Sequence, residues 1–381
     1  MRQNKPKIAM IGQKTVPSRS GGIEQVLTRL CPLLAARGFQ VACYNRRGEP
    51  HSGYAPFHAR EYRGVRLKDV FALKSGTGTA LYSFLATLRA CFCGSKILHY
   101  HAEGPAAMLW AAKLFGKKCV VTVHGLDWMR EKWQNEFAAK YIRFGEKLLA
   151  AKADAVIVLS QSAKRYFQTT YNRETIWIPN GADCMTPRPC KQIQERFGLQ
   201  KDTYFCTVCR LTPEKGLDDL IEAHKMAKTG KKLVIAGGPG ASGDYVQQLQ
   251  QKAGGDDSIF FTGFLNGELL EELYSNAFAF VLASSVEGMP LSLLEAMAYG
   301  CAVIGSDIEE IREVAGDCGL LYPCKDPKAL AACMQRLCDD EALRQTCKTK
   351  SLQQIKHRYS WEKIAGKTAA LYDALLEETQ P

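Results

Sequence analysis

The sequence has no long hydrophobic run. None of its apolar stretches reaches the 18 uncharged residues that a membrane-spanning helix needs. The first apolar run, residues 8–12, is also too short for the hydrophobic core of a signal peptide. We therefore expect a cytoplasmic protein with neither a transmembrane segment nor a secretory leader.

Dinucleotide and metal motifs are missing as well. Gly12 ends a short strand but is followed by Gln-Lys-Thr-Val, so the chain lacks a G-x-G-x-x-G fingerprint. Cys206 and Cys209 form a single C-x-x-C pair in a strand-like run, where their spacing turns the two side chains to opposite faces. The 15 cysteines are scattered and odd in number. We interpret them as reduced structural thiols, not as metal ligands or a disulfide framework.

Acidic residues are scarce in the first half of the chain. Residues 1–190 contain 29 Lys and Arg against 12 Asp and Glu, whereas residues 191–381 contain 21 against 27. The net charge of +11 is thus the sum of +17 and −6. A basic half suggests an anionic partner such as a membrane surface or a phosphorylated substrate, with a merely skewed solvated surface as the equal alternative. Nucleic acid is not expected, because the excess is diffuse and no aromatic-basic sheet motif accompanies it.

What the sequence does have is two series of alternating strand and helix patterns. Short apolar runs alternate with helical periodicity up to about residue 177, and the alternation starts again at residue 203. Strands without strict polar alternation that are separated by helices predict a parallel, doubly wound sheet. At 381 residues the chain has room for two such domains. We predict an α/β protein with two Rossmann-like parallel-sheet domains facing a central cleft.

Three segments carry residue types suited to an anion or a sugar. In SRSGGIEQV (18–26), Gly21 and Gly22 stand at a helix start, where exposed N–H groups attract anions, although a plain turn is equally compatible. In VCRLTPEKG (208–216), Arg210 and Lys215 leave the end of a strand together. Two such cations suit a diphosphate, and a pair of surface cations is the alternative.

The third segment is SSVEGMPLSLLEAMAYG, residues 284–300. Pro290 suits the first turn and Gly300 the end of an apolar helix that should be buried. Glu287 lies just before this helix and Glu295 lies inside it. Because an unpaired buried carboxylate is strongly unfavourable, we expect ribose or sugar hydroxyls as partners, with an internal salt bridge as the alternative.

Together these segments resemble the retaining nucleotide-sugar glycosyltransferases of family 4, which have the GT-B fold. The resemblance rests on Glu287-x7-Glu295, CRLTPEKG, IPNGAD, TVHG and the early GG-x-E, in the family's order and over essentially the whole chain. The stretch HAEGPA…TVHGLDWMREKW further resembles a bacterial, rhamnosyltransferase-like branch of polysaccharide assembly. One position departs from the pattern, since the family usually has Gly where this chain has Cys209.

The resemblance implies domains and roles. An acceptor-binding domain would span residues 1–182, with the last helix (360–381) packing back on it, and a donor-binding domain would span residues 190–358. Arg210 and Lys215 would bind the diphosphate, Glu287 the donor sugar and Glu295 the ribose. The expected catalytic residues are Glu287, Arg210, Lys215 and His124, the last of which would lie near the donor sugar. Gly288, Met289, Pro290 and Leu291 would add backbone contacts to the phosphate and the sugar, and Gly21 and Gly22 would bind substrate by closing the cleft from the other half.

The resemblance also implies the reaction. The donor would be a nucleotide-diphosphate sugar, and the acceptor a glycan or lipid-linked saccharide of a cell-surface polysaccharide. The acceptor would attack from the front side, the departing phosphate would take its proton, and the anomeric configuration would be retained. No cofactor and no metal are expected, and the lack of a DxD-like acidic pair agrees.

Other polar residues are candidates for the acceptor side. His99 and His101 alternate on a strand and precede Glu103, so all three could share one face. We favour acceptor binding by His101 and Glu103 over a metal triad. Asp127, two residues past the glycine of TVHG, is a further candidate for acceptor contact.

The helical region at residues 131–151 combines aromatic residues with cations. Such a stripe can lie on an anionic membrane, although packing on the protein's own sheet is commoner. With the basic half, it suggests peripheral association with the inner face of the plasma membrane. The aromatic residues are Trp133, Phe137, Tyr141 and Phe144, and the cations are Arg130, Lys132, Lys140, Arg143 and Lys147.

Two other functions stay open. A nucleotide-sugar epimerase would share the architecture and need no acceptor, and a non-catalytic sugar-nucleotide-binding protein would keep the pocket alone. The intact set of Arg210, Lys215, Glu287 and Glu295 argues against a decayed site. The transferase is therefore the leading prediction, with its base, sugar and acceptor still to be identified.

Overall fold

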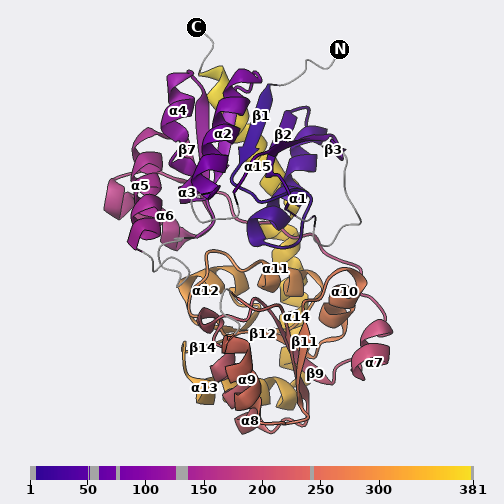
Figure 1. The fold of residues 1–381 in the computed structure, drawn as a ribbon. Helices are drawn as coiled ribbons and strands as arrows, with labels where there is room; N and C mark the ends of the chain where they lie inside the picture. Colours follow the sequence, from indigo (N-terminus) through magenta and orange to yellow (C-terminus); the bar gives the residue numbers. More distant parts are fainter. Residues whose placement is uncertain are drawn as a thin grey trace. The chain divides into compact units, whose positions relative to one another are not determined.

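The computed structural model describes residues 6–49, 51, 60–73, 78–125, 136–240 and 244–378. The chain divides into two compact units, Met1–Asn180 with Trp361–Pro381, and Gly181–Ser360 (Figure 1). The division between Asn180 and Gly181 falls in a segment rich in Pro, Gly and Asp, residues 178–190, which the sequence marks as a linker. Each unit is built on a largely parallel sheet flanked by helices, so the predicted α/β fold class is confirmed.

The first unit has an eight-stranded sheet in the order β3-β4-β2-β1-β5-β6-β7-β8. Its central strand β1 lies between β2 and β5 in parallel register, with Ile8 opposite both Val41 and Ile97. The short edge strand β3 pairs antiparallel with β4. The strands are β1 Lys7–Ile11, β2 Gln40–Arg46, β3 Glu61–Tyr62, β4 Val65–Val70, β5 Ile97–His101, β6 Lys118–Val123, β7 Ala155–Val158 and β8 Ile176–Trp177.

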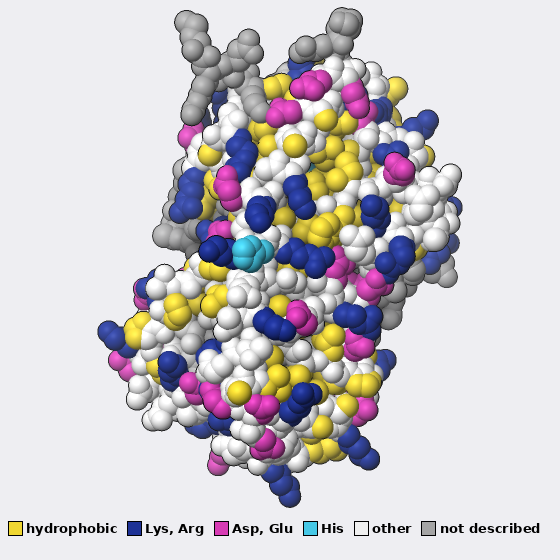
Figure 2. Space-filling model, turned by 180° about the vertical axis from the view of Figure 1, so that it is seen from behind, with side chains coloured by type: hydrophobic (Ala, Val, Ile, Leu, Met, Phe, Trp, Pro, Cys, Tyr) yellow, Lys and Arg dark blue, Asp and Glu magenta, His cyan; other side chains and the backbone are white. Residues whose placement is uncertain are grey.

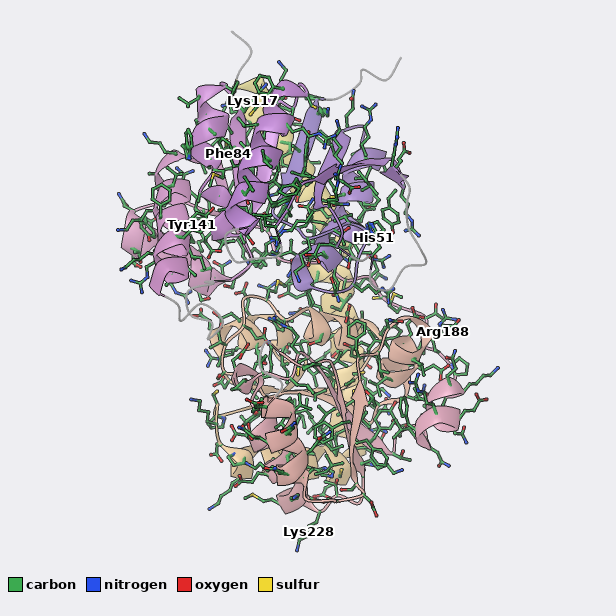
Figure 3. All side chains as sticks on the ribbon, viewed as in Figure 1. His51, Phe84, Lys117, Tyr141, Arg188 and Lys228 are labelled. Atoms are coloured by element: carbon green, nitrogen blue, oxygen red, sulfur yellow. The ribbon has the colours of Figure 1, made fainter. Side chains whose placement is uncertain are left out.

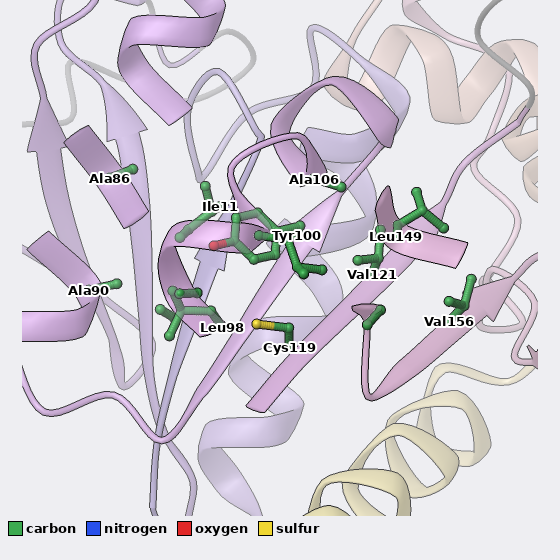
Figure 4. Packing of buried hydrophobic residues seen from close by; sticks show 14 of the residues in the cluster. Ile11, Ala86, Ala90, Leu98, Tyr100, Ala106, Cys119, Val121, Leu149 and Val156 are labelled. Carbon is green, nitrogen blue, oxygen red and sulfur yellow. The ribbon is translucent and has the colours of Figure 1, made fainter. Parts of the chain in front are cut away.

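Helices cover both faces of this sheet because its strands alternate between two buried sides. Leu98 and Tyr100 of β5 join the core under α2, α4, α5 and α6 (Figure 4). His99 and His101 face the other way, toward α1 and α15, where His99 contacts Tyr372 of α15. The helices are α1 Gly22–Ala36, α2 Gly78–Phe92, α3 Glu103–Ala106, α4 Leu109–Leu114, α5 Glu136–Lys152, α6 Gln161–Tyr171 and α15 Trp361–Glu377.

The second unit has a six-stranded parallel sheet in the order β11-β10-β9-β12-β13-β14. β9 and β12 are neighbours, with Phe205 opposite Ala279 and Cys206 opposite Phe280. The strands are β9 Tyr204–Val208, β10 Lys232–Ala236, β11 Ile259–Gly263, β12 Ala279–Leu282, β13 Val303–Ser306 and β14 Gly319–Tyr322. The helices are α7 Gln192–Phe197, α8 Leu217–Ala227, α9 Asp244–Ala253, α10 Gly267–Asn276, α11 Leu291–Ala298, α12 Glu309–Ala315, α13 Pro327–Asp339 and α14 Glu341–Gln354.

Each sheet has one place where the strand order reverses. The chain runs outward from β1 to β2 and β4 and then returns to β5, and in the second unit it runs from β9 to β11 and returns to β12. Ligands of open parallel sheets bind beyond the carboxyl ends of the strands at such reversals. The loops after β1 and β5, and those after β9 and β12, are therefore where the topology predicts binding.

None of the helices within the described ranges is long and apolar enough to span a bilayer.

Candidate active site

The loop after β9 carries the two predicted diphosphate ligands. Cys209 continues the pairing of the strand, since its N–H donates to the carbonyl of Ala236 at 3.1 Å. Burial raises the pKa of the Cys209 thiol to about 11, so this side chain is uncharged at neutral pH and adds no negative charge beside Arg210 and Lys215. Arg210 follows it and is exposed, and within the described part of the chain its guanidinium has no hydrogen bond or ion pair. Lys215 ends a short helical turn, Pro213–Lys215, ahead of α8.

Gly216 fixes how this loop meets the loop after β12. Its φ is +62°, in the left-handed region, and a Cβ at this position would collide with the carbonyl oxygen of Ala283. Beside it, the N–H of Ser285 donates to the carbonyl of Glu214 at 2.9 Å, and the Ser285 hydroxyl donates to the same oxygen at 3.3 Å. Glycine permits this close approach of two backbones, which holds the two loops together.

Lys215 and Glu287 form an ion pair between these loops. The Lys215 Nζ lies 2.6 Å from the Glu287 Oε1, and the two side chains are 15% and 10% exposed. The sequence left open whether the carboxylates of this segment would have an internal salt bridge, and Glu287 has one. The structure thus brings two predicted catalytic residues into direct contact.

Helix α11 begins just beyond Glu287. Pro290 is its N-cap, one position before the first helical residue, and no side-chain hydrogen bond caps the first turn. Gly288, Met289 and Pro290 are buried and Leu291 is half-buried. The first N–H groups of a helix lack partners within the helix and carry its positive dipole end. Lys215 and this helix start therefore together favour an anion at the carboxyl edge of the sheet.

Glu295 is half-buried, so it is less buried than the sequence predicted, although Leu294 and Ala296 beside it are buried as expected. Its Oε2 accepts a hydrogen bond from the hydroxyl of Tyr274 on α10 at 3.1 Å. Burial, followed by the charge of Glu295, raises the pKa of Tyr274 well above its usual range, so its hydroxyl stays protonated and donates. Tyr274 has no distinctive signal in the sequence, because a tyrosine among apolar helix residues is typical of a core position.

In the first unit, Gly21 is the N-cap of α1 and Gly22 its first residue. Glu24, in the first turn of α1, is buried and accepts a hydrogen bond from the N–H of Lys14 at 2.7 Å. A Cβ on Gly21 would meet the Glu24 carboxylate, so glycine leaves room for that side chain. The start of α1 thus already holds one carboxylate, which weakens the case for a phosphate at the glycine pair.

Three histidines, His99, His101 and His124, lie in a row on the side of the first unit's sheet that faces α1 and α15. The ring centroids of His99 and His101 are 4.3 Å apart, and the His101 Nδ1 lies 3.1 Å from the His124 Nε2. His99 also contacts the Tyr372 hydroxyl at 2.5 Å and the Thr122 hydroxyl at 2.7 Å. Burial, helped by repulsion from His124, lowers the pKa of His99 to about 3. Burial and the two neighbouring histidines lower the pKa of His101 well below its usual value, so both rings are neutral.

The sequence suggested that Glu103 could share a strand face with His99 and His101, but it does not. It opens the short helix α3, and its side chain is fully buried. No cluster of three or more His, Cys, Asp or Glu within the described ranges could hold a metal ion, so the alternative of a metal triad finds no support. Asp127 lies outside the described residues.

A small cavity lies beside the histidine row. Its volume is about 20 Å³, and α1, β5, β6 and α15 contribute Val26, His101, Thr122 and Trp361 to its lining. Such a volume holds about one water molecule. This cavity is therefore too small for a sugar. His124, which also lines it, is half-buried at the end of β6 and is thus the most exposed member of the row.

The basic-aromatic stripe of α5 is divided between core and surface. Tyr141 (Figure 3) is half-buried, and burial raises its pKa to about 12. Leu148 packs against the core. Trp133 and the side chain of Phe137 lie outside the described residues. The exposed members are Lys140, Arg143, Phe144 and Lys147.

Two family descriptions match the chain. Residues 191–354 match glycosyl transferases group 1, and residues 20–185 match glycosyltransferase family 4. The O-antigen chain mannosyltransferase B of Escherichia coli is 26% identical over 229 residues, which cover 59% of this chain but only 58% of that relative. The glycogen synthase of Mycobacterium tuberculosis is 27% identical over 409 residues, covering 98% of this chain and 96% of that protein.

Solved structures share the architecture. Sucrose-phosphate synthase of Thermosynechococcus elongatus superposes with a TM-score of 0.84 at 24% identity, over 98% of this chain and 100% of the other. Anabaena HepE in complex with UDP-glucose superposes with a TM-score of 0.79 at 17% identity, over 97% and 100%. At these identities the likeness shows the fold, two parallel-sheet α/β domains.

Proposed function

Because the chain belongs to the family-4-like glycosyltransferases, which have the GT-B fold, we propose that it transfers a sugar from a nucleotide-diphosphate sugar to a glycan or lipid-linked acceptor. The observation that carries this proposal is the Lys215–Glu287 ion pair at the strand-order reversal of the second unit. Proteins similar to this chain also support the proposal, since one is named as an O-antigen mannosyltransferase and one structural neighbour was solved in complex with UDP-glucose. A role in cell-surface polysaccharide synthesis follows from the same relative.

The second unit would bind the donor. A sugar nucleotide has an anionic diphosphate between two rings rich in hydroxyl groups. Arg210, Lys215 and the uncapped start of α11 supply positive charge and N–H donors for the diphosphate. Glu287 and Glu295 supply acceptors for the hydroxyls of the sugar and the ribose. These cations, N–H groups and carboxylates are the partners that the diphosphate and the hydroxyl groups of such a donor need.

The same charges suit the departure of the nucleotide. As the bond between the anomeric carbon and the phosphate oxygen breaks, negative charge grows on that oxygen. Lys215 is already held by Glu287, so its ammonium needs no reorganisation to stabilise this charge. The acceptor hydroxyl would attack from the side of the leaving phosphate, which takes its proton. Configuration would then be retained without a protein nucleophile, a metal or a cofactor.

The first unit would bind the acceptor. His124 is half-buried, whereas the side chains of His101 and Glu103 are 1% and 0% exposed. We therefore assign direct contact to His124, and to His101 and Glu103 the support of the site wall from behind. Asp127 stays a candidate for acceptor contact.

We also propose that this unit rests on an anionic membrane surface through the outer side of α5. Lys140, Arg143 and Lys147 are exposed there with Phe144, which is 53% exposed. On the face seen in Figure 2, cations are spread over both units and mixed with acids, so the proposal depends on this helix and not on overall charge. Sedimentation with liposomes tests it: binding to anionic vesicles at low salt is expected, and equal binding to neutral vesicles would contradict it.

The donor site is tested by thermal shift with UDP, GDP, TDP, ADP and NAD in the presence of EDTA. A ligand at roughly 100 times its Kd should add about 2.7 kcal/mol of stability. We expect a shift with one nucleoside diphosphate, lost in Glu295→Ala, and transfer activity that survives EDTA. No shift with any diphosphate would refute donor binding, and activity restored only by one divalent ion would refute the metal-free reaction. Isomerisation of the donor without acceptor would support the epimerase instead.

A further inference from the structure

Tyr274 stands outside every motif that led to the site. It belongs to α10, whereas the predicted donor ligands come from the loops after β9 and β12 and from α11. Its hydroxyl nevertheless donates to the Glu295 Oε2 at 3.1 Å. We propose that Tyr274 is a positioning residue that orients the Glu295 carboxylate toward the ribose of the donor. This inference rests on the proposed function, in which Glu295 accepts hydrogen bonds from the ribose hydroxyls.

The ring of Tyr274 is held rigidly. Tyr274 is 2% exposed and lies in a stacked arrangement with Tyr299, with ring centroids 5.7 Å apart and planes 14° from parallel. On another side its centroid is 5.9 Å from that of Phe280 on β12. Its carbonyl accepts a hydrogen bond from the thiol of Cys301 at 3.0 Å. A ring packed in this way presents its hydroxyl at one fixed place.

A glutamate side chain has several rotatable bonds, and Glu295 is only half-buried, so a fixed donor restricts the positions that its carboxylate can take. Immobilising a rotamer-rich side chain upon ligand binding is unfavourable, and a residue that pre-orients it lowers that cost. An ionised carboxylate has about four acceptor sites on two oxygens. The bond from Tyr274 uses one of these sites and restrains the position of Oε2, and the proposal assigns acceptance from the ribose hydroxyls to this oriented carboxylate.

The choice of tyrosine fits this task. A phenol that stays protonated can only donate to a carboxylate, so it does not compete with the ribose for the role of acceptor. Phenylalanine would fill the same volume between Tyr299 and Phe280 without this bond. Tyr274→Phe therefore removes the orientation of Glu295 while keeping the packing.

The test compares UDP with 2′,3′-dideoxy-UDP by calorimetry, or the same pair for whichever of GDP, ADP and TDP binds. We expect wild type to prefer the nucleotide with ribose hydroxyls. Tyr274→Phe should lower this preference by about 5- to 10-fold, mainly through weaker binding of the nucleotide with hydroxyls. Tyr204→Phe is the matched control, since Tyr204 is fully buried and its hydroxyl donates to the Leu273 carbonyl at 2.8 Å. That variant should lose stability and keep the preference within about twofold.

Glu295→Gln distinguishes a failure of donor binding at Glu295 from a failure of the positioning role of Tyr274. If wild type binds no nucleoside diphosphate, the proposed function fails and this inference fails with it. If Glu295→Gln loses the preference while Tyr274→Phe keeps it, the donor site stands and the role of Tyr274 is overturned. The double variant should bind like Glu295→Gln alone, because Tyr274 acts through that carboxylate. Additive losses would also overturn the inference.

Discussion

Gly216 and Gly198 form a matched pair for substitution by alanine. Both follow a short helical turn of the second unit and have φ +62°, with ψ of 30° and 25°. Gly198 has open space where a Cβ would be placed, whereas a Cβ on Gly216 would collide with the carbonyl oxygen of Ala283. The two variants therefore share the same backbone strain and differ in the contact between the loops of the site.

The magnitudes follow from these two terms. An L-residue in the left-handed region costs roughly 1–2 kcal/mol, so Gly198→Ala should lower the free energy of unfolding by about that amount. Gly216→Ala adds a collision with backbone atoms, which no side-chain rotation can relieve. We expect a total loss of about 3–5 kcal/mol, together with weaker nucleotide binding as Lys215 and Glu287 move apart.

Urea unfolding followed by circular dichroism measures these losses. Tryptophan fluorescence, recorded in parallel, reports on the first unit alone, because the chain has five Trp and all lie in that unit. For a substitution in the second unit, circular dichroism therefore follows the unfolding of both units, and tryptophan fluorescence follows the unfolding of the first unit. Equal losses for the two variants would refute the argument that the Ala283 carbonyl sets the distance between the loops.

Three further outcomes are expected. Lys215→Met and Glu287→Gln should each lower the free energy of unfolding by about 1–3 kcal/mol. The loss in the double variant should be smaller than the sum of the two single losses by at least about 1 kcal/mol. Additive losses in urea unfolding would contradict the ion pair. Burial holds the pKa of His99 near 3, below its ordinary 6.5, so between these values the unfolded chain binds a proton that the folded chain does not. Stability should therefore fall by about 2 kcal/mol for this histidine between pH 7 and pH 5. The fall should be less steep in His99→Phe, and an unaltered slope in that variant would be the contrary result. Tyr372→Phe removes the hydroxyl beside His99 and should lower thermal stability by about 1–2 kcal/mol, and a wild-type melting temperature would show that this contact is not needed.

The alternation of apolar runs and helical periodicity was enough to predict two parallel sheets, because their strands are buried on both faces. The beginnings and ends of helices were harder to predict from the sequence. The pattern of residues 105–115 predicts one helix, whereas the structure has two short helices, α3 and α4, separated by Ala107 and Met108 without a Gly or Pro to mark the break. Helix α6 was not predicted, since Ala163 and Phe167 are its only buried residues and give a weak pattern.

The site shows a similar limit. Motifs located Lys215 and Glu287, but these residues are 72 positions apart, and the neighbouring positions of β9 and β12 are what bring them into contact. Strand alternation correctly placed His99 and His101 on one face. It could not reveal that Tyr372, 273 positions from His99, meets that face. Side-chain partners from distant elements follow from packing, which a linear pattern does not contain.

The return of the chain to its first unit after residue 360 affects the order of folding during synthesis. Residues 181–360 form an uninterrupted unit, so the ribosome delivers all of it before α15 is made. The first unit, although its other elements are translated first, lacks α15 until residues 361–377 have been made. Phe39 and His99, which both pack against Tyr372, stay uncovered until then. A prematurely terminated chain would therefore expose this apolar surface to chaperones and proteases, while its later-made unit was already whole.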